Sequence, residues 1–347
     1  MNKIRTALLS YGMSGKLFHA PFIHIHPGFE LYGVWERTKN IARERYNDIT
    51  TFRSLESLLS DNSVELVVVN TPNVTHFDYA RQALLANKHV IVEKPFTVTS
   101  TEAEQLIKLA REQKKLLSVY HNRRYDSDFK TIKKVLNDGL LGKIHEAEFH
   151  FDRFRNELSP KQHKEVAMKG TGSLYDLGSH LIDQALQLFG FPQAVFADIR
   201  NIRTGSQVDD YFELLLYYND KRVRLKTNYL VREPLSGYII HGSIGSFIKQ
   251  RTDVQEQALQ KEIWPGSPGW GIEPENEMGL LHTEINGKVT REQFPSLPGN
   301  YMEYYDAIYK SLRNHNEAPV IPEEGLNVVR IIEAAFTSNA NKKVISL

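Results

Sequence analysis

Hydrophobic positions along the chain follow two different periods. In the first third, short apolar runs alternate with longer stretches in which apolar residues recur every three or four positions. The runs predict strands at 4–9, 29–35, 64–70, 89–92 and 116–120, and the stretches between them predict helices at about 15–24, 38–46, 75–87 and 100–113. Repeated strand–helix units with short connections indicate a parallel, doubly wound sheet.

After about residue 122, apolar and polar residues alternate instead. This pattern predicts strands at 144–151, 211–218, 222–230, 238–248 and 280–284, with tight turns at Asn219-Asp220 and Asn286-Gly287 and late helices at 300–314 and 323–340. We therefore predict an α/β chain in two domains. Residues 1–122 form a doubly wound Rossmann domain, and residues 123–347 form an α+β domain with a large, mostly antiparallel open sheet. The C-terminal helices could pack back on the first domain.

The composition limits the classes of function. Of 347 residues, 41% are apolar and 24% are charged, and the formal net charge is +1. The sequence has no excess or stripe of basic residues of the kind that would indicate a nucleic-acid or membrane partner. The absence of cysteine excludes disulfides, zinc–thiolate sites, iron–sulfur clusters and thiol nucleophiles, and is consistent with a cytoplasmic protein. The apolar stretch 7–9 is too short for a signal peptide, and no apolar run is long enough to span a bilayer.

The segment Leu-Leu-Ser-Tyr-Gly-Met-Ser-Gly, residues 8–15, follows a predicted strand and opens a predicted helix. It matches the dinucleotide fingerprint G-x-G-x-x-G, except that Ser10 replaces the first glycine. Gly12 would let the backbone approach a pyrophosphate, and Gly15 would allow close helix–strand packing. The helix N-terminus favours negative charge. Taken alone, the segment is equally consistent with an ordinary glycine-containing turn.

An acidic residue after the second predicted strand supports the nucleotide interpretation. Glu36 lies 21 residues beyond Gly15, where the fingerprint expects a carboxylate that binds ribose hydroxyls. Arg37 follows and could instead pair with a 2′-phosphate, but we favour NAD over NADP. A solvated surface pair is the alternative for these two residues alone. The third predicted strand ends in Asn70-Thr71-Pro72, at the carboxyl edge where open α/β sheets bind ligands.

The fourth predicted strand ends at the same edge in Glu93-Lys94-Pro95. A lysine there would face the ligand crevice, where its ammonium can hold a substrate hydroxyl and stabilise an alkoxide. Proline limits the backbone freedom behind it. For an isolated Glu-Lys pair, a surface salt bridge is the simpler interpretation.

Asp176 and His180 form a second candidate site. Their spacing of four places both on one face of a predicted helix, with Asp183 on nearly the same face. A carboxylate beside an imidazole orients the ring and favours its protonated form, which suits proton exchange with a hydroxyl. A plain helix ion pair is the alternative. A metal site is disfavoured because no second histidine has ligand spacing here.

These motifs, in this order, resemble the Gfo/Idh/MocA oxidoreductases, the family of glucose–fructose oxidoreductase and inositol dehydrogenase. The resemblance covers nearly the whole chain. Segments 11–22, 71–76, 121–129 and 241–249 are similar to one bacterial branch, which includes scyllo-inositol dehydrogenases. The family fold implies an N-terminal Rossmann domain and a C-terminal α/β domain, whose large open sheet often forms a dimer interface.

The resemblance also implies roles for particular residues. Lys94 would hold the reacting oxygen, His180 would exchange its proton, and Asp176 would orient His180. The residues implied to bind the cofactor, NAD or NADP, are Tyr11, Gly12, Met13, Ser14, Gly15, Glu36, Arg37, Asn70, Thr71, Pro72, His76, Glu93, Lys94 and Asn122. The implied protein is a cytoplasmic NAD(P)-dependent dehydrogenase that acts on a CH–OH group of a sugar or cyclic polyol such as an inositol. It would have no metal, and it would be a homodimer or dimer of dimers through the C-terminal sheet.

Several interpretations remain open. The same fold could carry an NAD-dependent glycoside hydrolase that uses its cofactor transiently, or a non-catalytic sugar sensor. The charged residues Asp152, Arg153, Arg155 and Lys164 are a candidate substrate rim or a solvated cluster. The segment 264–271, rich in proline, glycine and tryptophan, is a candidate lid.

Overall fold

The structure is a computed structural model that describes residues 3–159 and 165–347. The chain forms two compact units, which are described separately below. The first contains the segments up to 122, 255–270 and 300–326. The second contains 123–254, 271–299 and 327–347. The first unit therefore includes two segments from the C-terminal half of the chain.

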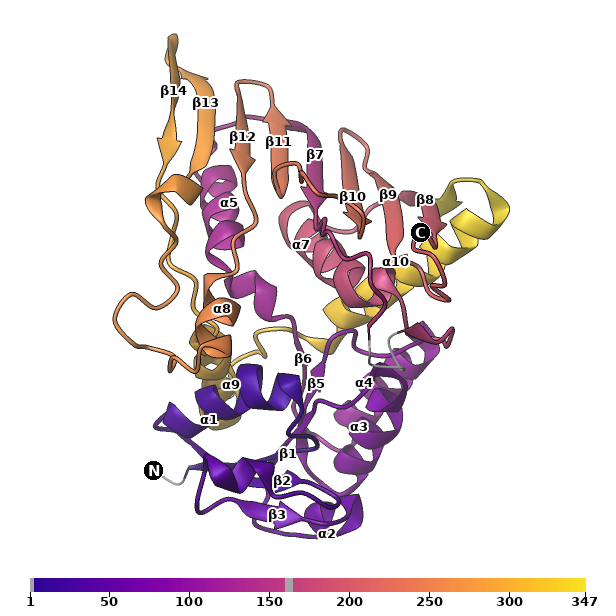
Figure 1. The fold of residues 1–347 in the computed structure, drawn as a ribbon, viewed down its shortest axis with the longest axis vertical. Helices are drawn as coiled ribbons and strands as arrows, with labels where there is room; N and C mark the ends of the chain where they lie inside the picture. The colour runs from indigo at the N-terminus through magenta and orange to yellow at the C-terminus, as the bar shows by residue number, and fades with distance from the viewer. Residues whose placement is uncertain (1–2, 160–164) are drawn as a thin grey trace. The chain divides into compact units, whose positions relative to one another are not determined.

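Six parallel strands form the sheet of the first unit, in the order β3-β2-β1-β4-β5-β6. Their bounds are β1 Ile4–Leu8, β2 Phe29–Trp35, β3 Thr50–Phe52, β4 Leu66–Val69, β5 His89–Glu93 and β6 Leu117–Tyr120 (Figure 1). The order reverses between β1 and β4, which is the point where doubly wound sheets open a crevice for ligands. Strand β4 is fully buried, as expected for a sheet covered on both faces.

Helices connect these strands and cover the sheet. Helices α3 and α4 lie side by side in Figure 1. The bounds in the first unit are α1 Ala20–Ile25, α2 Leu55–Leu59, α3 His76–Leu85, α4 Ser100–Glu112 and α9 Met302–Asn314. Helix α8, Val254–Gln260, begins at the boundary of this unit, and α10, Pro322–Asn341, runs from this unit into the second. None of the helices in the described ranges has the length and apolar character needed to cross a membrane.

The helix predicted at 38–46 is wrong. Only Ile41–Glu44 forms a short 3₁₀ turn there. The Arg53 guanidinium donates hydrogen bonds to the carbonyl oxygens of Glu36 (2.9 Å) and Lys39 (2.7 Å), so these carbonyls are turned away from a helical ladder. Strand β3 and helix α2 were not predicted, because neither is long enough to show a period.

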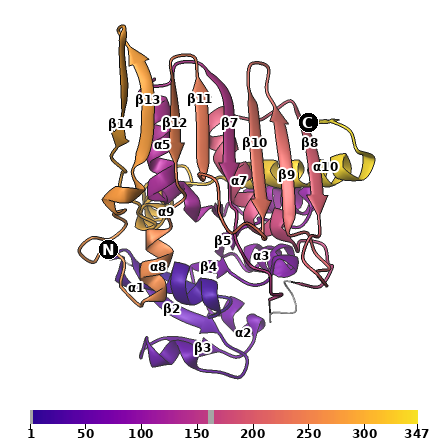
Figure 2. The ribbon, with the colours of Figure 1, turned by 45° about the horizontal axis from the view of Figure 1, so that its top comes forward.

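Nine strands form the sheet of the second unit, in the order β14-β13-β12-β11-β7-β10-β9-β8-β15. Figure 2 shows this sheet from β14 across to β8. Their bounds are β7 Ile144–His150, β8 Ala194–Arg200, β9 Tyr211–Tyr217, β10 Arg222–Asn228, β11 Tyr238–Gly242, β12 Gly245–Lys249, β13 Gly279–Ile285, β14 Lys288–Phe294 and β15 Ile345–Ser346. Strands β7 and β10 pair in parallel, and the other neighbours pair antiparallel. The two sheets together confirm the predicted fold class.

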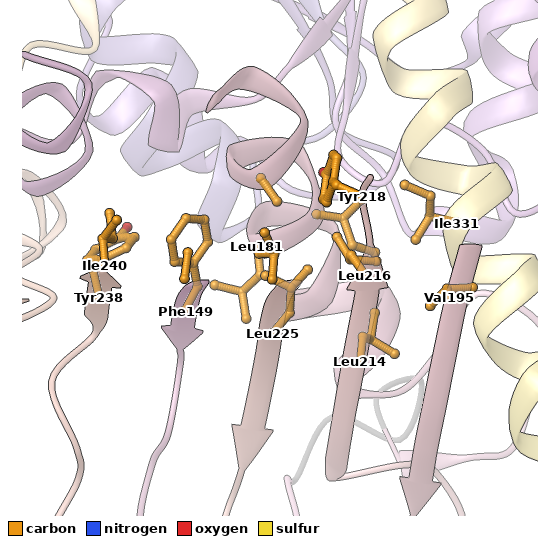
Figure 3. Close-up of a cluster of buried hydrophobic side chains, with 14 of the residues drawn as sticks. Phe149, Leu181, Val195, Leu214, Leu216, Tyr218, Leu225, Tyr238, Ile240 and Ile331 are labelled. Atoms are coloured by element: carbon orange, nitrogen blue, oxygen red, sulfur yellow. The ribbon is translucent and has the colours of Figure 1, made fainter. Parts of the chain in front are cut away.

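Helices cover one face of this second sheet. They are α5 Ser127–Asn137, α7 Ser179–Phe189 and most of α10. Figure 3 shows the resulting core, in which Leu181 of α7 and Ile331 of α10 lie over side chains from several strands. Alternate residues of β9, namely Phe212, Leu214 and Leu216, belong to this core. The residues between them lie on the face of the sheet that these helices do not cover.

Residues 238–248, predicted as one strand, form two. Strands β11 and β12 pair antiparallel around a tight turn that begins at Gly242. A Cβ at Gly242 would lie 2.1 Å from the Leu141 carbonyl oxygen, so only glycine fits where the strand ends beside Leu141. Strands β8 and β14 were also missed, because each carries charged residues that weaken its apolar alternation.

Candidate functional site

The loop after β1 is held by a side chain from the end of β4. The Asn70 amide oxygen accepts a hydrogen bond from the Ser10 backbone nitrogen (3.0 Å), and the Asn70 amide nitrogen donates to the Ser10 carbonyl (2.7 Å). The Ser10 hydroxyl oxygen accepts a hydrogen bond from the Gly12 backbone nitrogen (3.1 Å). Serine at the first fingerprint position therefore closes the turn that leads into the helix.

The two glycines of this loop differ in what surrounds them. A Cβ at Gly15 would lie 2.2 Å from the Ser10 carbonyl oxygen, so only glycine fits. A Cβ at Gly12 would meet nothing closer than the Ser10 hydroxyl oxygen at 3.4 Å. Gly12 and Met13 are exposed, and Ser14 is partly exposed. The backbone of this short segment is therefore accessible in the way that a bound pyrophosphate requires.

Glu36 is buried just after β2, and each of its carboxylate oxygens accepts a hydrogen bond from a backbone N–H group. Ile41 N donates to Oε1 at 3.0 Å, and Ala42 N donates to Oε2 at 3.2 Å. The neighbouring Arg37 is exposed. The acidic side chain therefore caps the turn Ile41–Glu44, and the basic side chain is the one that faces solvent.

An aromatic cluster lies beside this loop in the first unit. The Tyr11 ring packs edge-on against Tyr46, with 6.3 Å between centroids, and burial raises the pKa of Tyr11. Trp264 lies under the Arg45 guanidinium, 4.5 Å from the ring, and 5.6 Å from the His24 ring. The Tyr11 side chain thus serves packing, and the candidate lid segment 264–271 is anchored at Trp264 within the first unit.

Glu93, at the end of β5, joins three parts of the first unit. It accepts hydrogen bonds from the Ser14 hydroxyl, from the Lys94 backbone nitrogen (3.2 Å) and from the His19 ring at Nε2 (2.9 Å). The other nitrogen of His19 lies 2.6 Å from the Tyr305 hydroxyl. Burial alone would raise the pKa of Glu93, but the hydrogen bonds and charges around it lower that pKa to about 2.

Glu93 therefore stays ionised and links the fingerprint helix to the strand end that carries Lys94. His19 was missed in the sequence. Its position four residues after Gly15, on the inner face of the helix, is the signal that could have found it.

The loops after β4 and β5 are joined by the fully buried His76. Its Nδ1 lies 2.8 Å from the Pro95 carbonyl oxygen, and its Nε2 lies 2.9 Å from the Thr71 carbonyl oxygen. Burial lowers the pKa of His76. The peptide bond between Lys94 and Pro95 is cis, and Lys94 itself is partly exposed. His76 therefore fixes the loops after β4 and β5, which carry Thr71, Pro72 and Lys94.

The other two candidates also lie at carboxyl ends of strands. Pro72 precedes the turn Asn73–Thr75 after β4, and Asn122 is buried just after β6. The candidates thus follow β1, β2, β4, β5 and β6 along one sheet edge. The open backbone at 12–14, the small residue at Gly12 and the solvent-facing Arg37 fit a dinucleotide there.

In the second unit, a buried aspartate clamps the start of the helix that carries Asp176. Asp209 Oδ2 accepts hydrogen bonds from the Ser173 hydroxyl (2.9 Å) and the Leu174 backbone nitrogen (2.7 Å). Gly172 has φ +97, and a Cβ there would lie 1.9 Å from Asp209 Oδ1. Burial raises the pKa of Asp209 to about 6, although these hydrogen bonds oppose the shift.

The segment with Asp176 and His180 differs locally from the predicted helix. Leu174–Gly178 is a π-helical turn, and α7 continues from Ser179. Asp176 is partly exposed, whereas His180 is 5% exposed. The fingerprint helix also begins with a π-helical turn, Gly15–His19. Such turns insert an extra residue into a helix and occur frequently at functional sites.

Asp183 forms an ion pair with Arg124. The Arg124 guanidinium donates two hydrogen bonds to its carboxylate, at 2.9 Å and 2.6 Å. Both side chains are nearly buried. Asp183 is thus tied to the residues just after β6, and its ion pair with Arg124 anchors α7.

Tyr229, directly after β10, was missed by the sequence analysis. Burial is the largest cause that raises the pKa of its phenol to about 12; the charge of Asp176 adds to the shift, and the charges of Arg153, Arg155 and Arg203 oppose it. Its phenol therefore lies within electrostatic range of one proposed catalytic residue and of the candidate rim. An aromatic residue closing a predicted strand was the available signal.

Of the four candidate rim residues, Lys164 lies outside the described residues. Asp152 is nearly buried and lies 3.4 Å from His150, whereas Arg153 is partly exposed and Arg155 exposed. Residues 153–155 run beside the end of β10, with Arg153 N bonded to the Asn228 carbonyl (2.9 Å) and Arg155 N to the Tyr229 carbonyl (2.7 Å). In the part of the chain that is described, no group of three or more His, Cys, Asp or Glu side chains could hold a metal ion.

Comparisons with known proteins extend these observations. A family model described as the NAD-binding Rossmann fold of the Gfo/Idh/MocA oxidoreductase family matches residues 4–121. The model for the C-terminal alpha/beta domain of the same family matches residues 133–347.

Among curated relatives, scyllo-inositol 2-dehydrogenase (NADP(+)) IolW of Bacillus subtilis (strain 168) is 39% identical, over 100% of this chain and 97% of the relative. The uncharacterized oxidoreductase YdgJ of Escherichia coli (strain K12) is 38% identical, over 100% and 99%. A crystal structure of a putative oxidoreductase from Bacteroides fragilis NCTC 9343 superimposes with a TM-score of 0.92 at 45% identity and covers 100% of both chains.

Proposed function

Because the chain belongs to the Gfo/Idh/MocA oxidoreductase family, we propose that it transfers a hydride between a nicotinamide cofactor and a carbinol carbon of a sugar or cyclic polyol. The accessible backbone at 12–14 supports a bound dinucleotide. The full-length similarity to an inositol dehydrogenase supports the class of substrate.

We propose NADP as the preferred cofactor, in place of the NAD expected from the sequence. That expectation needed a Glu36 carboxylate open to ribose hydroxyls, whereas Glu36 is buried and each of its oxygens already accepts a backbone hydrogen bond. Arg53 braces the same loop, and the exposed Arg37 is available to pair with a 2′-phosphate. The relative IolW is named as an NADP(+) enzyme, which is consistent with this proposal.

For catalysis, we propose that Lys94 holds the reacting oxygen of the substrate through its ammonium group. His180 would exchange the hydroxyl proton, and Asp176, four residues earlier, would orient the His180 ring. When bound, the nicotinamide supplies or accepts the hydride. The positive charge of Lys94 stabilises the alkoxide that forms as the proton leaves. The backbone that carries Lys94 is held by two hydrogen bonds, one from Lys94 N to the Glu93 carboxylate and one between the His76 ring and the Pro95 carbonyl.

The test offers a panel of inositols and sugars to the protein with NADP⁺ or NAD⁺. The absorbance of the reduced nicotinamide is measured during the first turnover. The wild-type protein should reduce NADP⁺ with at least one polyol, and Lys94→Ala should lower the rate by about 10²-fold or more. Lys108→Ala, an exposed lysine of α4, is the matched control and should keep the full rate. Full activity of Lys94→Ala would remove Lys94 from the mechanism.

Two outcomes of the same panel would support other functions. Release of free sugar from a glycoside without a net change in reduced cofactor would support the glycoside hydrolase. Tight sugar binding without any turnover would support the sensor.

For cofactor choice, Arg37→Ala should raise KM for NADP⁺ about tenfold or more and leave KM for NAD⁺ nearly unchanged.

We also propose that the protein forms a homodimer through the face of the second sheet that lacks helices. That face carries Glu213 and Leu215 of β9 together with Arg224 and Lys226 of β10, all partly buried in the single chain. Mixed charges around partly buried apolar residues are typical of a protein interface. Light scattering during size-exclusion chromatography should give a mass of at least two chains; a single-chain mass at micromolar concentration would contradict the proposal.

A further inference from the structure

Three guanidinium groups of the second unit gather around one aromatic ring. The centre of the Phe151 ring lies 4.5 Å from the Arg251 guanidinium, 4.9 Å from that of Arg153 and 5.3 Å from that of Arg123. Contact with the ring face attracts each cation separately. The cations still repel one another over such short distances, so the cluster needs negative charge nearby.

Arg123 has its own counter-ions. Its guanidinium lies 2.6 Å from the Asp253 carboxylate and 3.2 Å from that of Asp126. A fourth arginine close by, Arg203, is similarly compensated, at 2.8 Å from Asp210 and 3.1 Å from Glu165. These two arginines are therefore structural, and neither has a full charge to offer a ligand.

Arg251 is bound to neutral acceptors instead. It donates to the His150 carbonyl (3.2 Å) and to the Gln184 side-chain oxygen (3.2 Å). Within the described residues, its Nη1 atom is buried and has no hydrogen-bond partner. Burial raises the pKa of the nearby Asp128, which weakens that carboxyl as a permanent counter-ion. A buried N–H group of a cation without an acceptor is costly unless a ligand supplies one.

Arg153 is the least compensated member of the cluster. Across the described ranges, its guanidinium has no hydrogen-bond or ion-pair partner, and it packs over the Phe151 ring. It is partly exposed, so it can reach a ligand from solvent. Its backbone is fixed by hydrogen bonds to Asn228 (2.9 Å) and from Val231 (3.0 Å), which places it beside the end of β10.

Arg153 and the proposed catalytic Asp176 both lie within electrostatic range of the same phenol. Tyr229 follows β10 directly, and its phenol is influenced by the charges of both Arg153 and Asp176. Arg155 N also bonds to the Tyr229 carbonyl (2.7 Å). A substrate held at Asp176 and His180 would therefore extend toward Arg153.

On these grounds, and resting on the proposed function, we infer that the substrate carries an anionic group, a carboxylate or a phosphate, which Arg153 binds beside the Phe151 ring. Guanidinium groups match both anions with paired hydrogen bonds, which a neutral polyol cannot replace. Arg251 adds positive potential beside the same ring. The dehydrogenase would then favour a sugar acid or a sugar phosphate over the corresponding neutral sugar.

The experiment compares matched substrates with the full-length protein and NADP⁺. The probes are D-glucose, D-glucuronate and glucose 6-phosphate, so that the carboxylate and phosphate arms are separate. The inference predicts kcat/KM at least tenfold higher for one anionic probe than for glucose. Arg153→Gln should lower that anionic-to-neutral ratio at least tenfold, and Arg153→Lys should lower it less. A control, Arg200→Gln, removes an arginine that stacks on Tyr211 and pairs with Asp198, and it should keep the wild-type ratio.

Two results would overturn the inference: equal kcat/KM for charged and neutral probes, or an Arg153→Gln variant that keeps the wild-type ratio. Calorimetric binding of the same probes separates this inference from the proposed function. Binding of an anionic probe that is at least tenfold weaker in Arg153→Gln supports the anion site even where no turnover occurs. Turnover of neutral polyols alone, without binding of either anion, supports the dehydrogenase and contradicts the anion site.

Discussion

The Asn70 side-chain amide and the Ser10 backbone form a reciprocal pair of hydrogen bonds, 3.0 Å and 2.7 Å long, between the ends of β4 and β1. The two residues are distant in the chain, yet this pair sets the shape of the loop proposed to hold the pyrophosphate. Asn70 thus stabilises, through two hydrogen bonds, a turn whose first position is normally a glycine in the fingerprint.

Replacing Asn70 with alanine should weaken cofactor binding. The Asn70→Ala variant loses both hydrogen bonds, each worth about 1 kcal/mol net, so the Kd for NADPH should rise about tenfold. The increase in NADPH fluorescence on binding measures it. Asn62→Ala, an exposed asparagine of the same unit, should bind like the wild type. An unchanged Kd for Asn70→Ala would show that the loop keeps its shape without these two hydrogen bonds.

The two fingerprint glycines should separate stability from binding. Gly15→Ala places a methyl group 2.2 Å from the Ser10 carbonyl, and the overpacking should cost about 1–3 kcal/mol of unfolding free energy. Gly12→Ala meets only a 3.4 Å contact, so its stability without cofactor should stay within about 0.5 kcal/mol. Its affinity for NADPH should nevertheless fall tenfold or more, because the methyl group occupies the approach of the pyrophosphate. Thermal unfolding and cofactor titration of both variants provide the check.

The ionised Glu93 should stabilise the fold in a pH-dependent way. Its pKa falls from 4.5 to about 2 on folding, so its contribution is present above pH 4.5 and is lost as the pH falls toward 2. At neutral pH it amounts to about 3 kcal/mol. Glu93→Gln should unfold at lower urea concentration at pH 6, and the difference from the wild type should shrink between pH 4.5 and pH 3. The exposed Glu44→Gln serves as control; a constant difference over this range would contradict the low pKa.

The contribution of Asp209 to the stability of the fold should depend on pH in the opposite direction. Its pKa rises from 3.8 to about 6 on folding, so the folded state binds the proton more tightly. The associated stability is present below pH 3.8 and is lost as the pH rises through 6. Asp209→Asn keeps an oxygen acceptor for Leu174 and Ser173 but cannot ionise.

Between pH 4 and pH 7, the melting temperature should therefore change less in Asp209→Asn than in the wild type. The exposed Asp48→Asn should follow the wild-type pH curve. Identical curves for Asp209→Asn and the wild type would rule out titration of Asp209 in this range. Differential scanning calorimetry across this range is the measurement.

Much of the fold could be predicted because the spacing of apolar residues within most strands and helices already shows the element's type. Strand β2 has the predicted bounds, Phe29–Trp35, and β9 and β10 form the predicted hairpin. The helix predicted at 38–46 failed for a reason outside the segment: Arg53, which lies beyond it in the chain, donates hydrogen bonds to the carbonyl oxygens of Glu36 and Lys39. A local pattern cannot register a hydrogen bond from a distant residue.

The sequence by itself determined which side chains follow each strand of the first sheet, and it determined the family, because motif order and spacing are linear properties. The parallel sheet then brings those strand ends to one edge. Only the tertiary structure decided which partner each side chain takes: Glu36 caps a turn, His19 binds Glu93, and Asp183 pairs with Arg124. The physical reason is that a carboxylate pairs with whichever donor the fold places within about 3 Å, and that distance depends on packing among segments far apart in the chain.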